Sequence, residues 1–276
     1  MMEMSMKELR VAIAQIRGVK ADLAYNKKRV MEMIEQAHEL QADYLLFPEF
    51  FLTGNELSIA SDHTASSSIH VSTSAMLAEI GEQCRRYQIG VVIGLVEAEA
   101  DQQYNAAVLI DKQGKTVGTY RKIHLFEYEQ SRFSHGRELP VFDLPEVRMG
   151  IMISHDMEYP EVARILALNG AQLLVVLSSS TVLDTEQDSL YLRGRAMENH
   201  LFIACANKVG LEDNQLFAGG SKWIHPSGDI LYTCSHNEEL AVHQLQLTDI
   251  EHTKGALDYL KNRRPDIYEK EGYKQV

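Results

Sequence analysis

Short apolar runs alternate with longer amphipathic stretches along most of the chain, a pattern typical of α/β proteins. The apolar runs predict strands at Arg10–Ile16, Tyr44–Pro48, Gly90–Val96, Gln103–Ile110, Arg148–Ser154, Leu173–Ser178, Leu201–Lys208, Ser221–His225 and Leu240–Gln246. Residues 26–40 carry apolar side chains on one helical face, at Val30, Met33, Ile34, Ala37 and Leu40. Further helices are predicted at Thr73–Tyr87, after Pro160 with Val162, Ile165, Leu166 and Leu168, and at Asp188–Asn199 with Leu190, Leu192 and Met197.

The stretch from Gln103 to Val117 changes this picture from a parallel sheet to a mixed one. Its apolar and polar residues alternate, and Gln113-Gly114 supplies a turn in the middle. An antiparallel hairpin is therefore predicted within a set of helix-covered sheets.

No Pro-, Gly- or Ser-rich linker divides the chain, and no repeat is visible. The polar stretch Ser58–Ser74 is predicted as a loop that leads into the helix at Thr73–Tyr87. With 276 residues, one core can bury about three quarters of the unfolded surface. We therefore predict a single domain over residues 1–276.

A formal net charge of −12 argues against a nucleic-acid surface, because phosphate binding needs clustered Lys and Arg. The acids are interpreted as a solvated surface. The first residues show no basic region followed by an apolar stretch, and no apolar run reaches the roughly 18 residues that span a bilayer. We predict a cytoplasmic protein with no nucleic-acid or membrane partner.

The cysteines and histidines favour neither disulfides nor a metal site. Cys84, Cys205 and Cys234 lack close spacing and are predicted to be buried free thiols, which fits a reducing cytoplasm. The 11 histidines are dispersed, and no pair has zinc-binding spacing within a helical pattern. No metal or cofactor is predicted.

Candidate chemistry gathers at three strand ends. The apolar strand before Ser154 is followed by a polar turn and then by a helix after Pro160, so Ser154 lies at a strand-to-helix junction. Free backbone N–H groups at such a junction can stabilise an oxyanion. Glu49 ends another apolar strand, and Lys122 follows the turn-rich segment around Gly114.

Together, Leu45–Gly54, Tyr120–Phe126 and Gly150–Glu161 resemble the nitrilase, or carbon-nitrogen hydrolase, superfamily. In that family a Glu, a Lys and a Cys, in this chain order, hydrolyse non-peptide C–N bonds through a thioester. The resemblance continues over nearly the whole chain, at Val11–Gln15, Arg195–Asn199, Ala206–Gly210, Gly220–Gly228 and Arg263–Tyr268.

The resemblance implies roles for several residues. Glu49 stands at the general-base position, Lys122 at the lysine position and Ser154 at the nucleophile position. A second glutamate near the lysine is Glu129, with Glu127 as the competing assignment. Further, the backbone N–H of His155 is implied in the oxyanion hole, and the pocket-lining residues include His155, Ser178 and Ser179.

The fold implied by the resemblance is a four-layer α-β-β-α sandwich with two mixed sheets packed face to face. The outer helices often build a dimer in this family, so a homodimer or higher homo-oligomer is expected, with a C-terminal tail near residues 255–276 at the subunit interface. The implied partner is a small amide. An amide is favoured over a nitrile because His155-Asp156 resembles the amidase and carbamoylase branches, and the choice among aliphatic amides, ω-amides of dicarboxylates and N-carbamoyl compounds stays open.

Ser154 departs from the family pattern, which has cysteine there. A thiol has a pKa of about 8.5, and a nearby cation can lower that pKa. A serine hydroxyl is far less acidic and normally needs an oriented base to accept its proton. A triad of Ser154, His155 and Asp156 is an alternative, but adjacent residues at a strand end point in different directions. Because the surroundings are intact, we favour a Cys-to-Ser replacement introduced to prevent turnover and retain ligand over a natural pseudoenzyme or scaffold protein.

Overall fold

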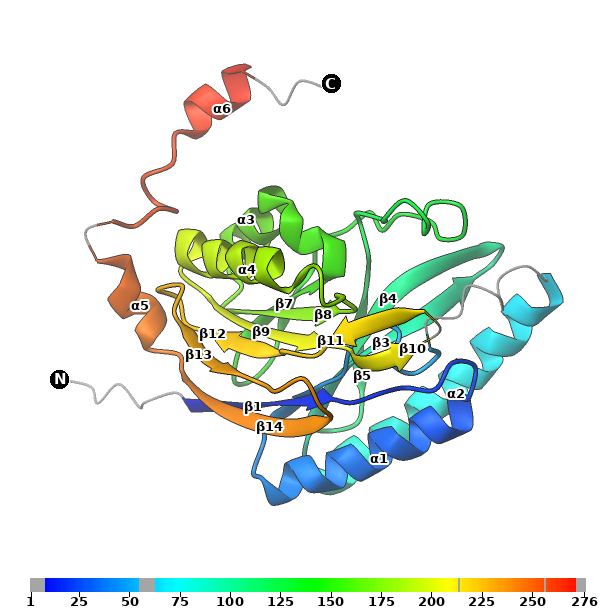
Figure 1. Cartoon of the computed structure of the whole chain (residues 1–276). Coiled ribbons are helices and arrows are strands. Elements are labelled where there is room, and N and C mark those ends of the chain that lie inside the picture. Colours follow the sequence, from blue (N-terminus) through cyan, green and yellow to red (C-terminus); the bar gives the residue numbers. More distant parts are fainter. Residues whose placement is uncertain (1–7, 55–62, 213, 256, 272–276) are drawn as a thin grey trace.

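The computed structural model describes residues 8–54, 63–212, 214–255 and 257–271. Two six-stranded sheets form its centre (Figure 1). The first sheet has the order β14 (Glu239–Gln246), β1 (Glu8–Gln15), β2 (Tyr44–Leu46), β3 (Gly90–Glu99), β4 (Gln102–Ile110) and β5 (Thr116–Arg121). The second has the order β13 (Ile230–Thr233), β12 (Lys222–Ile224), β9 (Phe202–Asn207), β8 (Leu173–Ser178), β7 (Arg148–Ile153) and β6 (Val141–Asp143).

Both sheets are mixed. The strands β1, β2 and β3 are parallel, as are β7, β8 and β9, while the outer strands pair antiparallel. The predicted hairpin is confirmed, because β4 and β5 pair antiparallel through the turn at Gly114, whose φ is +82°.

Alternate residues of each strand enter different cores. In β1, Val11 and Ile13 lie between the two sheets, whereas Ala12 and Ala14 face the helices of the first outer layer. Because both faces of the sheet are covered, the strands read as nearly continuous apolar runs. Trp223 of β12 is fully buried in the core between the sheets.

The helices complete four layers (Figure 1). On the first sheet lie α1 (Leu23–Glu39) and α2 (His63–Tyr87), and on the second lie α3 (Pro160–Leu168) and α4 (Thr185–Asn199). The predicted α-β-β-α sandwich with two mixed sheets is therefore confirmed. After β14 follow α5 (Asp249–Lys254) and α6 (Pro265–Glu271), and α6 lies away from the sheets in Figure 1. The placement of this tail at a subunit interface stays a prediction.

Two sequence predictions are wrong in detail. Helix α2 begins at His63, so residues 63–72, predicted as loop, are helical, while residues 58–62 lie outside the described part. Once a helix is nucleated, each added residue forms a hydrogen bond, so polar residues extend it at small cost. Leu40 is 43 % exposed, because α1 ends before it and it serves as the C-cap.

Each outer helix buries one face and exposes the other. In α3, Val162 and Leu166 are buried, but Ile165 and Leu168 are exposed. Only Leu192 of the three apolar residues predicted for α4 is buried. Among the described residues, no helix combines the length and apolar character that a membrane span requires.

Candidate active site

The segment that carries Glu49 follows β2 and packs directly against β3. The Leu52 N–H donates to the Gly94 carbonyl over 3.0 Å. A Cβ atom at Gly94 would lie 2.6 Å from both the Phe50 nitrogen and the Pro48 oxygen. Only glycine therefore lets this segment approach β3, and Glu49 is held almost fully buried at 4 % exposure.

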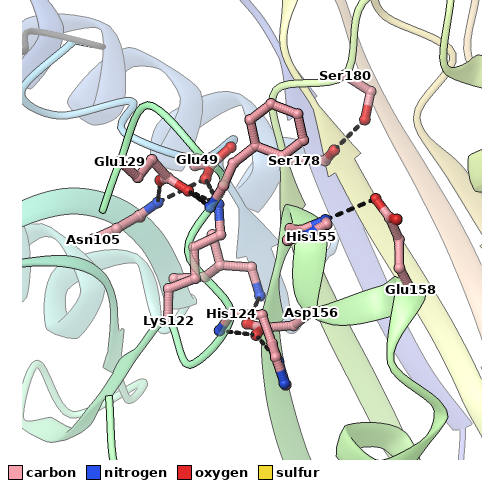
Figure 2. A network of polar contacts seen from close by, with 12 residues as sticks. Glu49, Asn105, Lys122, His124, Glu129, His155, Asp156, Glu158, Ser178 and Ser180 are labelled. Atoms are coloured by element: carbon pink, nitrogen blue, oxygen red, sulfur yellow. Dashed lines mark hydrogen bonds and ion pairs between the residues drawn. The ribbon is translucent and has the colours of Figure 1, made fainter. Parts of the chain in front are cut away.

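The β4-β5 hairpin brings Lys122 to the same site. Ala106 pairs with Arg121, and one residue further the Lys122 N–H donates to the Asn105 carbonyl over 2.8 Å. The side chains of Asn105 and Lys122 both point toward Glu49 (Figure 2). Their burial is nearly complete, with 1 % and 3 % exposure.

Lys122 forms two buried ion pairs. Its Nζ lies 3.0 Å from Glu49 Oε1 and 2.7 Å from Glu129 Oε2 (Figure 2). Burial alone would lower the pKa of Lys122, but the charges of Glu49 and Glu129 outweigh it and raise that pKa above its ordinary value. The side chain thus remains a cation at neutral pH and can stabilise negative charge. Glu127, the competing assignment for the second glutamate, is exposed.

Ser154 begins a tight turn at the end of β7. This turn is the 3₁₀ helix η2 (Ser154–Glu158), and Ser154 itself has a φ of +44°. A non-glycine residue in the left-handed region costs roughly 1–2 kcal/mol and is enriched at active sites. Because the first N–H groups of such a turn have no acceptor within it, the His155 N–H is available to a ligand.

The geometry argues against a Ser-His-Asp triad. Asp156 is fully buried and accepts a hydrogen bond from the Tyr120 hydroxyl over 2.7 Å. It also accepts hydrogen bonds from the backbone N–H groups of His124 and Ile153. His155 Nδ1 instead lies 2.9 Å from Glu158 Oε1 (Figure 2). Among the described residues, no hydrogen bond joins Ser154 to either side chain.

A cavity of about 190 Å³ opens beside Ser154. Glu49, Lys122, His155 and Ser179 line it as well, and Glu129 lies behind them against Lys122. Of the residues named from the sequence, Ser178 lies outside the lining. Its buried hydroxyl instead contacts the Ser180 hydroxyl over 2.7 Å (Figure 2).

Sequence reasoning missed the rest of the lining. These residues are Phe126, Tyr128, Met157, Glu158, Ser180, Thr181, Asp184, Gln187, Asp188 and Gln215. Three of them, Glu158, Asp184 and Asp188, are acidic. Burial and the charges of Asp184 and Glu158 raise the pKa of Asp188 to about 6, which indicates a crowded negative wall.

None of the three cysteines supplies the thiol that Ser154 lacks. Cys84, Cys205 and Cys234 are buried and unpaired, as predicted, and none lines the cavity. Burial raises the pKa of each thiol to about 12. They are packing residues rather than nucleophiles.

No group of three or more His, Cys, Asp or Glu side chains in the described ranges is arranged to hold a metal ion. The carboxylates of Glu49 and Glu129 are already paired with Lys122. The donors present therefore suit an organic substrate better than a cation.

Residues 10–255 match the profile of the family described as carbon-nitrogen hydrolase. An (R)-stereoselective amidase of a Pseudomonas species is 32 % identical over 257 residues, which cover 93 % of this chain and 92 % of that protein. A cysteine-to-serine mutant of the Nesterenkonia AN1 amidase, from the nitrilase superfamily, is 28 % identical with a TM-score of 0.84, covering 95 % of this chain and 97 % of that one. A cysteine-to-alanine mutant of an amidase from Nesterenkonia sp. AN1, solved with butyramide, is 26 % identical with the same TM-score over 95 % and 96 % of the two chains.

Proposed function

Because the chain belongs to the carbon-nitrogen hydrolase family, we propose that the cavity beside Ser154 is an amidase active site with Ser154 at the nucleophile position. The observation that carries the proposal is the Glu49-Lys122-Glu129 cluster at the cavity, with a left-handed residue 154 at its edge. The amidases among its relatives support an amide substrate.

The reaction is derived for the form with cysteine at residue 154. Glu49 accepts the thiol proton while the sulfur attacks the amide carbon, and Lys122 together with the His155 N–H stabilises the oxyanion. Collapse of this intermediate breaks the C–N bond, and Glu49 returns its proton to the departing ammonia. Water, deprotonated by Glu49, then cleaves the thioester and releases the acid.

Ser154 itself is a poor nucleophile in this setting. A hydroxyl ionises far less readily than a thiol, and the imidazole of His155 is bound to Glu158 instead. We therefore propose that the present form is inactive or strongly impaired. The intact Glu49, Lys122 and Glu129 support a recent Cys-to-Ser replacement over a long-standing loss of catalysis.

The charge of the cavity restricts the class of amide that can bind there. Lys122, the one cation of its described lining, is paired with two glutamates, and Glu158, Asp184 and Asp188 add three further acidic side chains to the lining. A carboxylate on the substrate would meet uncompensated negative charge there. Neutral or amine-bearing amides are therefore favoured over ω-amides of dicarboxylates.

The test compares the present protein with its Ser154→Cys variant by ammonia release. The panel holds butyramide, 4-aminobutyramide, succinamic acid, an N-carbamoyl amine and a nitrile. Release by the variant alone supports the proposal, with at least about tenfold lower kcat/KM for succinamic acid than for butyramide. Ser227→Cys, which adds a thiol at an exposed turn, is the matched control and should release nothing.

The rival candidate is a binding or scaffold protein on the same fold, which Ser154 favours if it is natural. It predicts that Ser154→Cys leaves ligand binding unchanged and that neither form releases ammonia from any compound of the panel. Equal ammonia release from both forms would instead make Ser154 a competent nucleophile and refute the derived chemistry.

A further inference from the structure

Asn105 joins the two glutamates of the cluster. Its Nδ2 lies 2.7 Å from Glu49 Oε1 and 2.8 Å from Glu129 Oε1 (Figure 2). The buried Oδ1 of the same amide accepts no hydrogen bond. This orientation is forced, because the reversed amide would place an acceptor against two carboxylates. The Asn105 side chain thus leaves its buried Oδ1 unpaired, while its amino group donates to both Glu49 and Glu129.

The donors around the two carboxylates are distributed unequally. Glu129 accepts from Asn105 on one oxygen, and from Lys122 and the Phe126 N–H on the other. Glu49 accepts from Asn105 and Lys122 on Oε1 alone. Its Oε2 accepts no hydrogen bond within the described part of the chain. Both oxygens of Glu129 therefore have donors, whereas Glu49 keeps one oxygen for a proton.

The charges are unequal as well. Two carboxylates and one ammonium lie together at 4 %, 0 % and 3 % exposure, for Glu49, Glu129 and Lys122. Lys122 supplies one positive charge, so the second negative charge depends on neutral donors. A second cation in place of Asn105 would balance this second negative charge, but it would also make it harder for Glu49 to accept a proton.

From this geometry we propose that Asn105 is a positioning residue that selects Glu49 as the general base. It holds Glu49 through Oε1, leaves Oε2 without a donor so that it can take the proton of the nucleophile, and binds Glu129 without adding charge. The inference rests on the proposed amidase function for its kinetic consequence. Its electrostatic consequence belongs to the protein as it is, with Ser154 in place.

The kinetic test uses Asn105→Ala and the equally sized Asn105→Asp in the Ser154→Cys background. Both should lower kcat about 10- to 100-fold with KM nearly unchanged, since Asn105 does not line the cavity. The acidic limb of the pH-rate profile should move up by about one pH unit, because a carboxylate that loses its donor keeps its proton longer. The same loss at every pH, with the limb unmoved, would overturn the positioning role.

Asn199→Ala is the matched control. Asn199 is likewise buried at 2 % exposure, donates to the Arg195 carbonyl and leaves its Oδ1 unpaired, but it lies at the end of α4 outside the cavity. It should leave the acidic limb in place. A limb that moved equally in this control would show that general loosening, not Asn105, sets it.

A second readout separates this inference from the proposed function. Carbon-13 NMR titration of the glutamate side chains is performed on the Ser154 protein, on Asn105→Ala and on Asn105→Asp. The midpoint of one buried glutamate should move up by about one pH unit in the variants. An unmoved titration overturns the inference even if Ser154→Cys is active, and a moved one supports it even if no amide is hydrolysed.

Discussion

Replacing Lys122 with methionine tests the electrostatics of the site through stability alone. Methionine keeps most of the side-chain length and removes the charge. In the present protein, with Lys122 intact, the raised pKa of Lys122 means that its stabilisation is fully present below the unfolded value near 10.4. It would be lost only as pH rises through the higher folded value, so between pH 5 and pH 8 the lysine does not titrate.

The expected cost follows from the distances. Glu49 Oε1 and Glu129 Oε1 lie within hydrogen-bond distance of one nitrogen, so they are at most about 5.5 Å apart. Two unit charges at that separation repel by about 3 kcal/mol at an effective dielectric constant near 20. Removing one partner from a buried ion pair typically costs about 3–5 kcal/mol. We expect Lys122→Met to lose about 3–5 kcal/mol at pH 8.

Urea unfolding followed by tryptophan fluorescence measures this loss, because the chain has one tryptophan and Trp223 is buried between the sheets. Lys27→Met is the control: Lys27 pairs with Glu79 at 2.6 Å on the surface and should cost no more than about 1 kcal/mol. A loss below about 1 kcal/mol for Lys122→Met at pH 8 would refute the reasoning.

Two further predictions concern stability and the path of the backbone. The folded pKa of Asp188 is raised to about 6 from 3.8, so its ionisation penalty is absent below pH 3.8 and complete above pH 6; Asp188→Asn should therefore raise stability by about 1–3 kcal/mol at pH 8. Thermal unfolding at pH 8 and pH 4 checks this, and a gain that persists at pH 4 would contradict it. Gly94→Ala should cost at least about 2 kcal/mol and remove amide hydrolysis from Ser154→Cys, because its Cβ would displace the Glu49 segment. Gly194→Ala, with open space around its Cβ in α4, should instead stabilise by about 0.5–1 kcal/mol; equal effects at both glycines would dismiss the steric argument.

The fold could be predicted largely because both faces of its strands are buried. Strands such as β8 and β9 then read as unbroken apolar runs, and the turn at Gly114 revealed the antiparallel hairpin. Helix ends were harder to predict. Nothing in the pattern of residues 63–72 distinguishes a polar loop from the polar start of α2, because propagation from the buried half decides it.

The candidate site could be predicted where polar residues interrupt strand ends, as at Glu49, Lys122 and Ser154. Asn105 was missed, although a polar residue inside an apolar strand signals a buried partner. The hairpin register would have placed it opposite Lys122. Asp188 was predicted only as the start of a helix, since periodicity alone does not say which face of a helix meets a cavity.

The pairing of β1 with β14 has a consequence for how the protein is made. Glu8 pairs with Gln246, so β1, the first strand along the described residues, is completed on one edge by β14, the last of these strands. At translation rates of about 5–20 residues per second, β1 waits roughly 10–50 s for that partner. During this time its open edge is a template for wrong pairing. Native assembly of the first sheet is thus a late event, and a shortened version that lacks β14 would leave this edge of β1 open.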